Sequence, residues 1–102
     1  MSLKTDLAEA IAREARLSIL RALAEQTDSR LSDILLKRAL DLYGYRRDRD
    51  WIRTHMRKLE DLGAVSLHEA GTVLIAKLER AGRDHLEERS VIEGIARPAE
   101  AD

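Results

Sequence analysis

Residues 52–65 read IRTHMRKLEDLGAV, and most of the fold can be derived from this stretch. Its apolar residues recur every three or four positions, which is the spacing of one buried face of an α-helix; they are Ile52, Met56, Leu59 and Leu62. Asp48 is a good N-cap, so we expect the helix to run from there to about Asp61 and to end at Gly63. The outward face is polar and mostly basic, and it carries Asp50, Arg53, Thr54, Arg57 and Asp61.

Two runs of apolar and β-branched residues come after this helix. Residues 64–68 read AVSLH and residues 72–76 read TVLIA, with Gly71 available for the turn between them. This pattern predicts a β-hairpin. Two strands alone are unstable in water, so we expect the hairpin to lie on the helices within a two- or three-stranded sheet.

One long helix is expected near the start of the chain. Residues 4–25 are rich in Ala, Leu, Glu and Arg and contain no Gly or Pro. The apolar stripe of this segment changes direction, because Leu7, Ile11 and Ala15 share one face whereas Ile19, Leu20 and Leu23 lie on a rotated one. We expect the second half to join the core. The first half then contacts either the C-terminal tail or a second copy of the protein in a homodimer.

Two more helices complete the predicted domain. One comes after a turn at residues 27–29, with Asp28 or Ser29 as its N-cap and Gly44 as its C-terminal stop. The other runs from Leu78 to about Arg89. The sequence thus predicts a single domain over residues 1–95, comprising a core at about 16–89 and a helical N-terminal extension at 4–15, and it predicts a flexible tail at 96–102.

Charge is distributed unevenly along the chain. The 102 residues contain 18 Lys and Arg against 19 Asp and Glu, for a net charge of −1. Residues 46–58 nevertheless carry +4, because six cations face only Asp48 and Asp50. Arginine predominates there, and its planar fork donates two parallel hydrogen bonds to a phosphate or to guanine. A solvated helix face is the alternative explanation, since charge alone is weak evidence for nucleic acid.

The residues that usually carry catalysis or bind metals are not arranged for it. Cys is absent, and His55, His68 and His85 have no partner at metal-ligand spacing. The adjacent carboxylates Glu87 and Glu88 point about 100° apart on a helix, so they do not converge on a substrate. We therefore predict a protein that is not an enzyme and has no metal and no cofactor. The lack of Cys, of a secretory leader and of a long apolar run predicts a cytoplasmic protein that does not enter a membrane.

The order of these elements, with a basic third helix, resembles the winged helix-turn-helix family. Residues 16–23 (RLSILRAL) look like the first helix of such domains, and residues 52–65 resemble the recognition helix that leads into the wing. Residues 73–86 (VLIAKLERAGRDHL) look like the second wing strand and the start of the last helix in multiple-antibiotic-resistance-type repressors. More narrowly, residues 91–98 (VIEGIARP) resemble the ending of small winged-helix proteins of Mu-like prophages.

This resemblance implies a mainly α-helical fold of the α+β class, with a three-helix core, a β-hairpin wing and a C-terminal helix. It also implies a transcriptional regulator of phage or prophage type that reads double-stranded DNA with its third helix and acts as a homodimer. Its expected DNA contacts, at base edges or phosphates, are Arg46, Arg47, Arg49, Arg53, Thr54, Arg57 and Lys58. The stripe expected at the dimer interface is Leu7, Ile11 and Ala15.

The expected wing tip departs from the family pattern. A DNA-reading wing usually carries Arg or Lys at its tip, whereas residues 68–71 read HEAG, which is short and acidic. Asp48, Asp50 and Asp61 also interrupt the basic face of the third helix. Both observations favour an alternative function, in which the domain is a protein–protein interaction module for phage assembly or host takeover and does not bind DNA.

Overall fold

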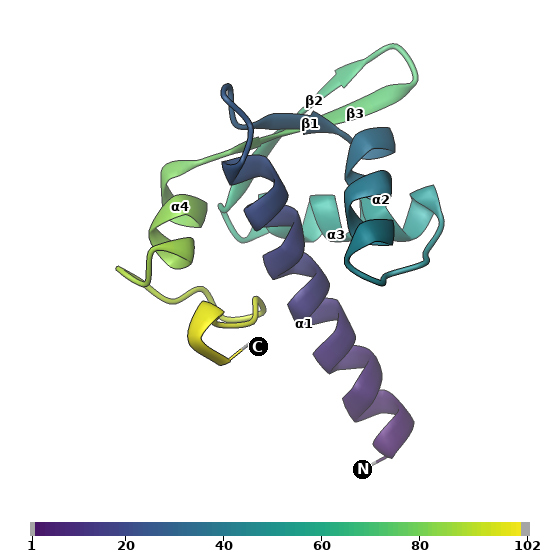
Figure 1. The fold of residues 1–102 in the computed structure, drawn as a ribbon, viewed down its shortest axis with the longest axis vertical. Coiled ribbons are helices and arrows are strands. Elements are labelled where there is room, and N and C mark those ends of the chain that lie inside the picture. The colour runs from purple at the N-terminus through teal and green to yellow at the C-terminus, as the bar shows by residue number, and fades with distance from the viewer. Residues whose placement is uncertain (1, 101–102) are drawn as a thin grey trace.

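The computed structural model describes residues 2–100 as one α+β domain, in which helices cover one face of an antiparallel sheet (Figure 1). The described elements, in chain order, are α1 (Leu3–Ala24), β1 (Arg30–Ser32), α2 (Asp33–Leu42), α3 (Arg49–Asp61), β2 (Val65–Ala70), β3 (Val73–Leu78), α4 (Arg80–Leu86) and a 3-10 helix, η1 (Pro98–Glu100). The mixed α+β class expected from the sequence is confirmed.

The core lies between the helices and the inner face of the sheet. The second half of α1 contributes Leu17, Ile19, Leu20 and Leu23, all almost completely buried, as the rotated stripe predicts. The α3 stripe is confirmed for its first three residues: Ile52, Met56 and Leu59 are fully buried, and Leu62 packs at the edge. Burying side chains of this size stabilises a domain by about 1.5–3 kcal/mol each, so these residues fix how α3 sits against α1.

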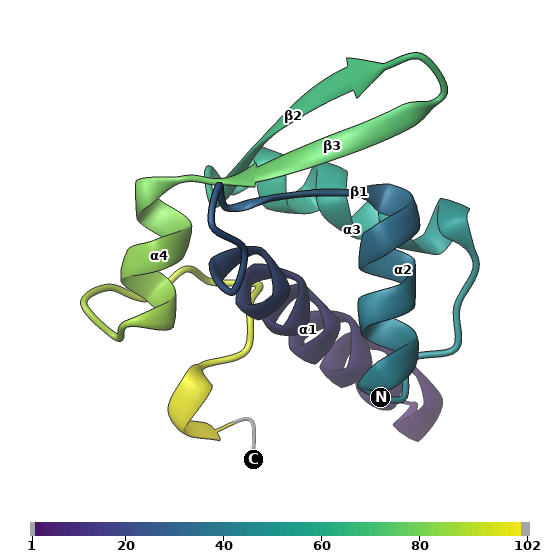
Figure 2. The same ribbon diagram turned by 45° about the horizontal axis from the view of Figure 1, so that its top comes forward.

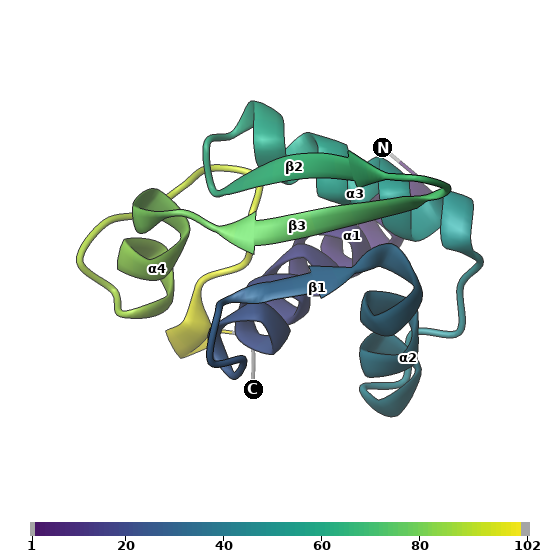
Figure 3. The same cartoon turned by 90° about the horizontal axis from the view of Figure 1, so that it is seen from above.

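The sheet has the order β1-β3-β2, and helices cover only one of its faces (Figure 3). The expected hairpin is confirmed, with β2 and β3 in register from Val65 opposite Leu78 to Ala70 opposite Val73. Gly71 has a φ of +61° in the turn, a conformation that L side chains rarely adopt. A third strand, β1, pairs with β3 on the other side.

The expected start of the second helix was wrong. Residues 30–32 form β1 and pair with residues 75–77, so α2 begins only at Asp33. Its N-cap is Ser32, whose Oγ accepts a hydrogen bond from Leu35 N–H at 3.2 Å, and not Asp28 or Ser29. The β3 residues with which residues 30–32 pair lie more than forty positions away in the chain. A local pattern of helical spacing cannot reveal such pairing.

The C-terminal region also differs from expectation. Leu78 belongs to β3, and α4 ends at Leu86 instead of about Arg89. The residues after it fold back along α1 (Figure 2): Ile95 is fully buried, and Ala96 N–H donates to the Arg13 carbonyl at 3.1 Å. Ala96 is thereby attached to α1, and Pro98–Glu100 form η1, whereas Arg97, Ala99 and Glu100 are exposed. The flexible tail expected at residues 96–102 stays a prediction, and residues 101–102 lie outside the described chain.

The N-terminal half of α1 extends beyond the rest of the domain (Figure 1). Every residue from Ser2 to Ala10 is exposed.

Within residues 2–100, no helix is long and apolar enough to cross a membrane.

Candidate nucleic-acid interface

Helix α3 carries most of the residues that the sequence assigns to DNA contact. Its N-cap is Asp48, as expected, and the Asp48 carboxylate accepts a hydrogen bond from Trp51 N–H at 2.8 Å. Because Ile52, Met56 and Leu59 fix one face in the core, Arg49, Arg53 and Arg57 form a stripe four residues apart on another. This arginine stripe faces the β2–β3 hairpin, where all three side chains have partners.

The first two arginines of the stripe converge on Asp33, the first residue of α2. The Asp33 side chain is fully buried, and its Oδ2 accepts from Arg49 Nε at 2.7 Å and from Arg53 Nε at 2.5 Å. Its Oδ1 accepts from Ile34 N–H at 3.0 Å and from Leu74 N–H at 3.2 Å. The carboxylate is therefore paired on both oxygens, which is what a buried charge requires.

These contacts keep Asp33 ionised. Burial alone would raise its pKa, but the hydrogen bonds from Arg49, Arg53 and Leu74 N–H outweigh it and lower the pKa from 3.8 to about 2. One negative charge thus faces two positive charges at neutral pH. The Asp33 cluster (Asp33, Arg49 and Arg53) retains a net charge of +1.

The same arginines hold the turn of the hairpin. Both donate through Nη2 to the Thr72 carbonyl, Arg53 at 2.7 Å. A guanidinium has five N–H donors, so two are used in each arginine and three remain. The Arg49 and Arg53 side chains are 38% and 30% exposed, so the remaining donors can reach solvent or a ligand.

The third arginine of the stripe makes a weaker contact. Arg57 Nη2 lies 3.9 Å from Glu69 Oε1 on β2, and both side chains are mostly exposed. Exposed ion pairs of this kind stabilise proteins by at most about 1 kcal/mol. A phosphate can therefore displace Glu69 from Arg57 at little cost.

The other four predicted contact residues are also exposed. Arg46 and Arg47 precede α3, and the Arg47 guanidinium lies 5.1 Å from the centre of the Trp51 ring, within the range of a cation–π contact. Thr54 Oγ1 donates to the Asp50 carbonyl at 3.0 Å, and Lys58 is exposed one turn further on. All seven predicted residues therefore lie on or next to α3. Of these seven, four have hydrogen-bond or ion-pair partners within residues 2–100, and the side chains of Arg46, Arg47 and Lys58 have none.

A second polar contact fixes α3 on its buried side, through His55. His55 is 6% exposed, and its Nδ1 accepts from Arg16 Nε at 3.2 Å, while Arg16 Nη1 donates to the Gly94 carbonyl at 2.7 Å. Burial and the neighbouring Arg16 charge lower the pKa of His55 to about 4. The imidazole is therefore neutral at pH 7 and accepts the Arg16 hydrogen bond.

The sequence did not reveal these two clusters. Asp33 and Arg16 are the residues that position α3, yet their partners on that helix lie 16 to 39 residues away in the chain. The signal that could have found Asp33 is a carboxylate directly after a helix N-cap, close to two arginines on the next helix. Without the fold, neither the carboxylate nor the two arginines show that these residues contact one another.

The predicted dimer stripe is only partly available. Leu7 is 58% exposed and Ile11 is half-buried, but Ala15 is fully buried within its own chain. A second copy cannot contact the Ala15 side chain, so Ala15 belongs to the core and not to an interface. Leu3, 82% exposed, continues the stripe in the other direction.

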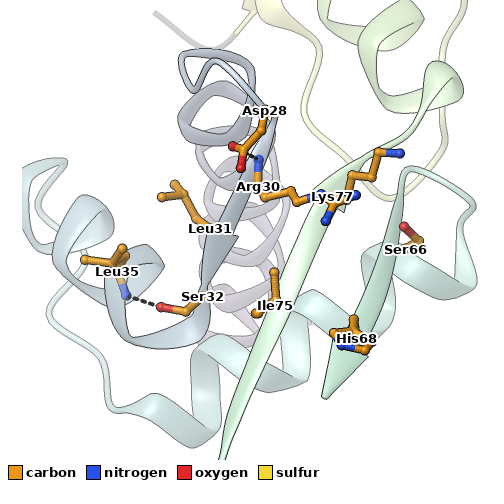
Figure 4. A pocket seen from close by; sticks show the side chains of 9 residues that line it. All are labelled: Asp28, Arg30, Leu31, Ser32, Leu35, Ser66, His68, Ile75 and Lys77. Atoms are coloured by element: carbon orange, nitrogen blue, oxygen red, sulfur yellow. Dashed lines mark hydrogen bonds between the residues drawn. The ribbon is translucent and has the colours of Figure 1, made fainter. Parts of the chain in front are cut away.

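A groove of about 610 Å³ lies on the uncovered face of the sheet (Figure 4), on the other side of the sheet from α3 (Figure 3). Ile75 lies centrally among its labelled residues, with Leu31 and Leu35 on one side and Ser66 and His68 on the other. Arg30 and Lys77 are neighbours across β1 and β3. Within residues 2–100, no three His, Asp or Glu side chains are grouped so that they could hold a metal ion.

Comparisons of the chain with protein-family models, with curated proteins and with solved structures found no match.

Proposed function

We propose that this protein binds double-stranded DNA as a winged-helix protein, with α3 in the major groove and the β2–β3 hairpin as the wing. The observation that carries this proposal is the arginine stripe between α3 and the hairpin. Arg49 and Arg53 are held by a buried carboxylate, and each keeps three unused N–H donors. Fixed guanidinium groups lose less conformational entropy when they bind phosphates or base edges.

The exposed cations around this stripe supply the remaining contacts. Arg46 and Arg47 lie at the start of α3, and Arg57 and Lys58 lie along it, so positive charge borders the helix from its N-terminus to its last turn. Positive charge in this arrangement attracts phosphates, and Thr54 between the two groups can contact a base. Arg49 and Arg53 then both bind DNA and hold the wing.

The role of Arg53 changes the choice of test variant. Replacing Arg53 would leave the buried Asp33 with one arginine, so a loss of binding could reflect a loss of structure. The informative variant is the double substitution Arg57→Ala and Lys58→Ala, because both side chains are exposed and lie outside the Asp33 cluster. Arg80→Ala is its control, since Arg80 is an exposed cation on α4.

The assay is fluorescence anisotropy with a labelled pool of random duplexes. The proposal expects the double variant to bind at least about tenfold more weakly, since each lost phosphate contact costs affinity, while Arg80→Ala binds as the unmodified protein does. Arg80→Ala removes one charge and the double variant two, so weakening by Arg80→Ala that is half as large on a logarithmic scale would show that only general charge matters. Unchanged binding in the double variant would contradict the proposed placement of α3, in which Arg57 and Lys58 contact phosphates.

A protein-interaction module is the second candidate, and one observation favours it. Glu69 on the hairpin is 75% exposed and sits beside Arg57, so the surface next to α3 is of mixed charge. Such a surface suits a protein partner that also carries both charges. If the protein retains no DNA even at low salt, this candidate replaces the first.

We also propose that copies of the protein associate through the exposed part of the α1 stripe. Leu3 and Leu7 are large apolar side chains that face solvent on a helix extending beyond the domain. Sedimentation as a monomer at every accessible concentration would exclude this association.

A further inference from the structure

The first part of α1, residues 3–14, is exposed as far as Ala10 and half-buried from Ile11 to Glu14; it has an apolar face with acidic neighbours, and we call it the α1 stub. Leu3 and Leu7 lie one turn apart on the same face and are 82% and 58% exposed. Asp6 lies beside Leu3 and Leu7, and Glu14 continues the face two turns after Leu7. This end of the helix therefore presents two leucines flanked by carboxylates.

The groove on the sheet has the complementary character. The sheet groove is the 610 Å³ depression of Figure 4, whose apolar residues are Leu31, Leu35 and Ile75. Leu35 is 47% exposed there, and no helix covers this face of the sheet (Figure 3). The groove therefore has apolar surface and enough room for leucine side chains.

Two cations border the groove without an acidic partner. Arg30 and Lys77 are directly opposite each other in the pairing of β1 with β3, and like charges in that position destabilise a sheet. The one carboxylate in the groove, Asp28, accepts from the Arg30 backbone N–H at 3.2 Å. Within residues 2–100, neither cation forms an ion pair, and neither do Asp6 or Glu14 of the α1 stub.

We propose that the α1 stub of one copy of this protein docks into the sheet groove of a second copy, with Leu3 and Leu7 on Ile75 and Leu35 and with Asp6 and Glu14 near Arg30 and Lys77. The leucines of the stub would contact the apolar residues of the groove, and the carboxylates of the stub would lie near the two cations of the groove. The inference deepens the proposed self-association and does not depend on DNA binding.

The positions of the two surfaces determine the kind of assembly. The α1 stub and the sheet lie at opposite ends of the molecule (Figure 1). A contact between different surfaces of two copies is head-to-tail, so it leaves one stub and one groove free and extends to a ring or a filament. We therefore expect masses above that of a dimer as the concentration rises.

Two variants that each block one surface test the proposal. Leu7→Lys blocks the stub, and Ile75→Glu places a negative charge in the groove. Val91→Lys is the control, because Val91 is a 49% exposed apolar residue outside both surfaces. Circular dichroism and Trp51 fluorescence establish that each variant is folded, and sedimentation equilibrium gives its mass.

The mixture of the two blocked variants gives the decisive result. Each variant alone is expected to be a monomer, whereas an equimolar mixture pairs the intact stub of Ile75→Glu with the intact groove of Leu7→Lys and forms a dimer and nothing larger. Val91→Lys is expected to associate as the unmodified protein does. If Ile75→Glu still associates while Leu7→Lys does not, the stubs pair with each other, and the groove assignment is wrong although self-association stands. If the unmodified protein is a monomer, or if the mixture stays monomeric, the proposed docking does not occur.

Discussion

Removing the charge of Asp33 is expected to cost the protein a measurable part of its stability. The pKa of this buried carboxyl is lowered from 3.8 to about 2, which corresponds to about 2.5 kcal/mol in favour of the ionised form in the folded state. In the variant Asp33→Asn, Arg49 and Arg53 keep their charges but lose the carboxylate, and the free energy of unfolding at pH 7 should fall by about this amount or more.

The pH dependence separates this cause from a general packing defect. Because the folded-state pKa is below the unfolded one, the stabilising contribution is complete above about pH 4 and is lost as the pH falls toward 2. Urea unfolding of both proteins should therefore show a difference that shrinks over this range. Asp41→Asn is the control: Asp41 forms only an exposed pair with Lys37 at 3.5 Å, and its loss should cost under about 0.5 kcal/mol.

Either of two results would refute this role of Asp33. One is a stability of Asp33→Asn within about 0.5 kcal/mol of the unmodified protein at pH 7. The other is a difference between the two proteins that stays constant from pH 4 to pH 2, since an ionised Asp33 must lose its advantage there.

Three further changes test other parts of the fold. The pKa of His55 is lowered to about 4, so as the pH falls the unfolded chain binds a proton at this residue before the folded protein does. The free energy of unfolding should therefore fall by roughly 3 kcal/mol between pH 6.5 and pH 4, and His55→Gln should remove this pH dependence. A His55→Gln protein that keeps the full pH dependence would contradict the role of His55. Gly82→Ala should lower the Tm, because a Cβ at Gly82 would lie 2.4 Å from the Ala64 carbonyl oxygen, and an unchanged Tm would show that the backbone adjusts freely. Ser32→Ala should lower the free energy of unfolding, measured with urea, by about 1 kcal/mol, because α2 loses its N-cap. Ser90→Ala is the control, since Ser90 is an exposed serine outside the helices. Equal stability of the two variants would contradict the capping role of Ser32.

The sequence predicted the parts of the fold that local patterns determine. The buried stripe Ile52, Met56 and Leu59 follows from helical spacing, and the β2–β3 hairpin follows from two β-branched runs around Gly71. The change of direction in the α1 stripe correctly placed Ile19, Leu20 and Leu23 of the second half in the core. Of the two partners expected for the first half, the C-terminal segment is seen to contact it, through Ala96 N–H and the Arg13 carbonyl.

The parts that were wrong depend on contacts between distant segments. Residues 30–32 become a strand because β3, more than forty positions later in the chain, offers them an edge. Ala15 was placed at an interface because its spacing matches Leu7 and Ile11, yet its own chain encloses it.

The candidate site shows the same division. The sequence placed seven polar residues on and before α3, and the structure brings them together there. It did not show that Arg49 and Arg53 already bind Asp33 and the Thr72 carbonyl. Charge counts along a sequence treat such arginines as free, whereas the fold assigns part of their hydrogen-bonding capacity to the protein itself.

DNA binding through α3 is best tested by the salt dependence of binding to a random pool of duplex DNA, followed by sequencing of the retained fraction. If Arg46, Arg47, Arg57 and Lys58 each neutralise a phosphate while Arg49 and Arg53 contact base edges, the logarithm of the association constant should fall with the logarithm of salt concentration. The expected slope is about −3.6 per protomer, and the retained pool should be enriched in a motif. No retention at low salt, or an affinity that does not change with salt, would contradict DNA binding through α3.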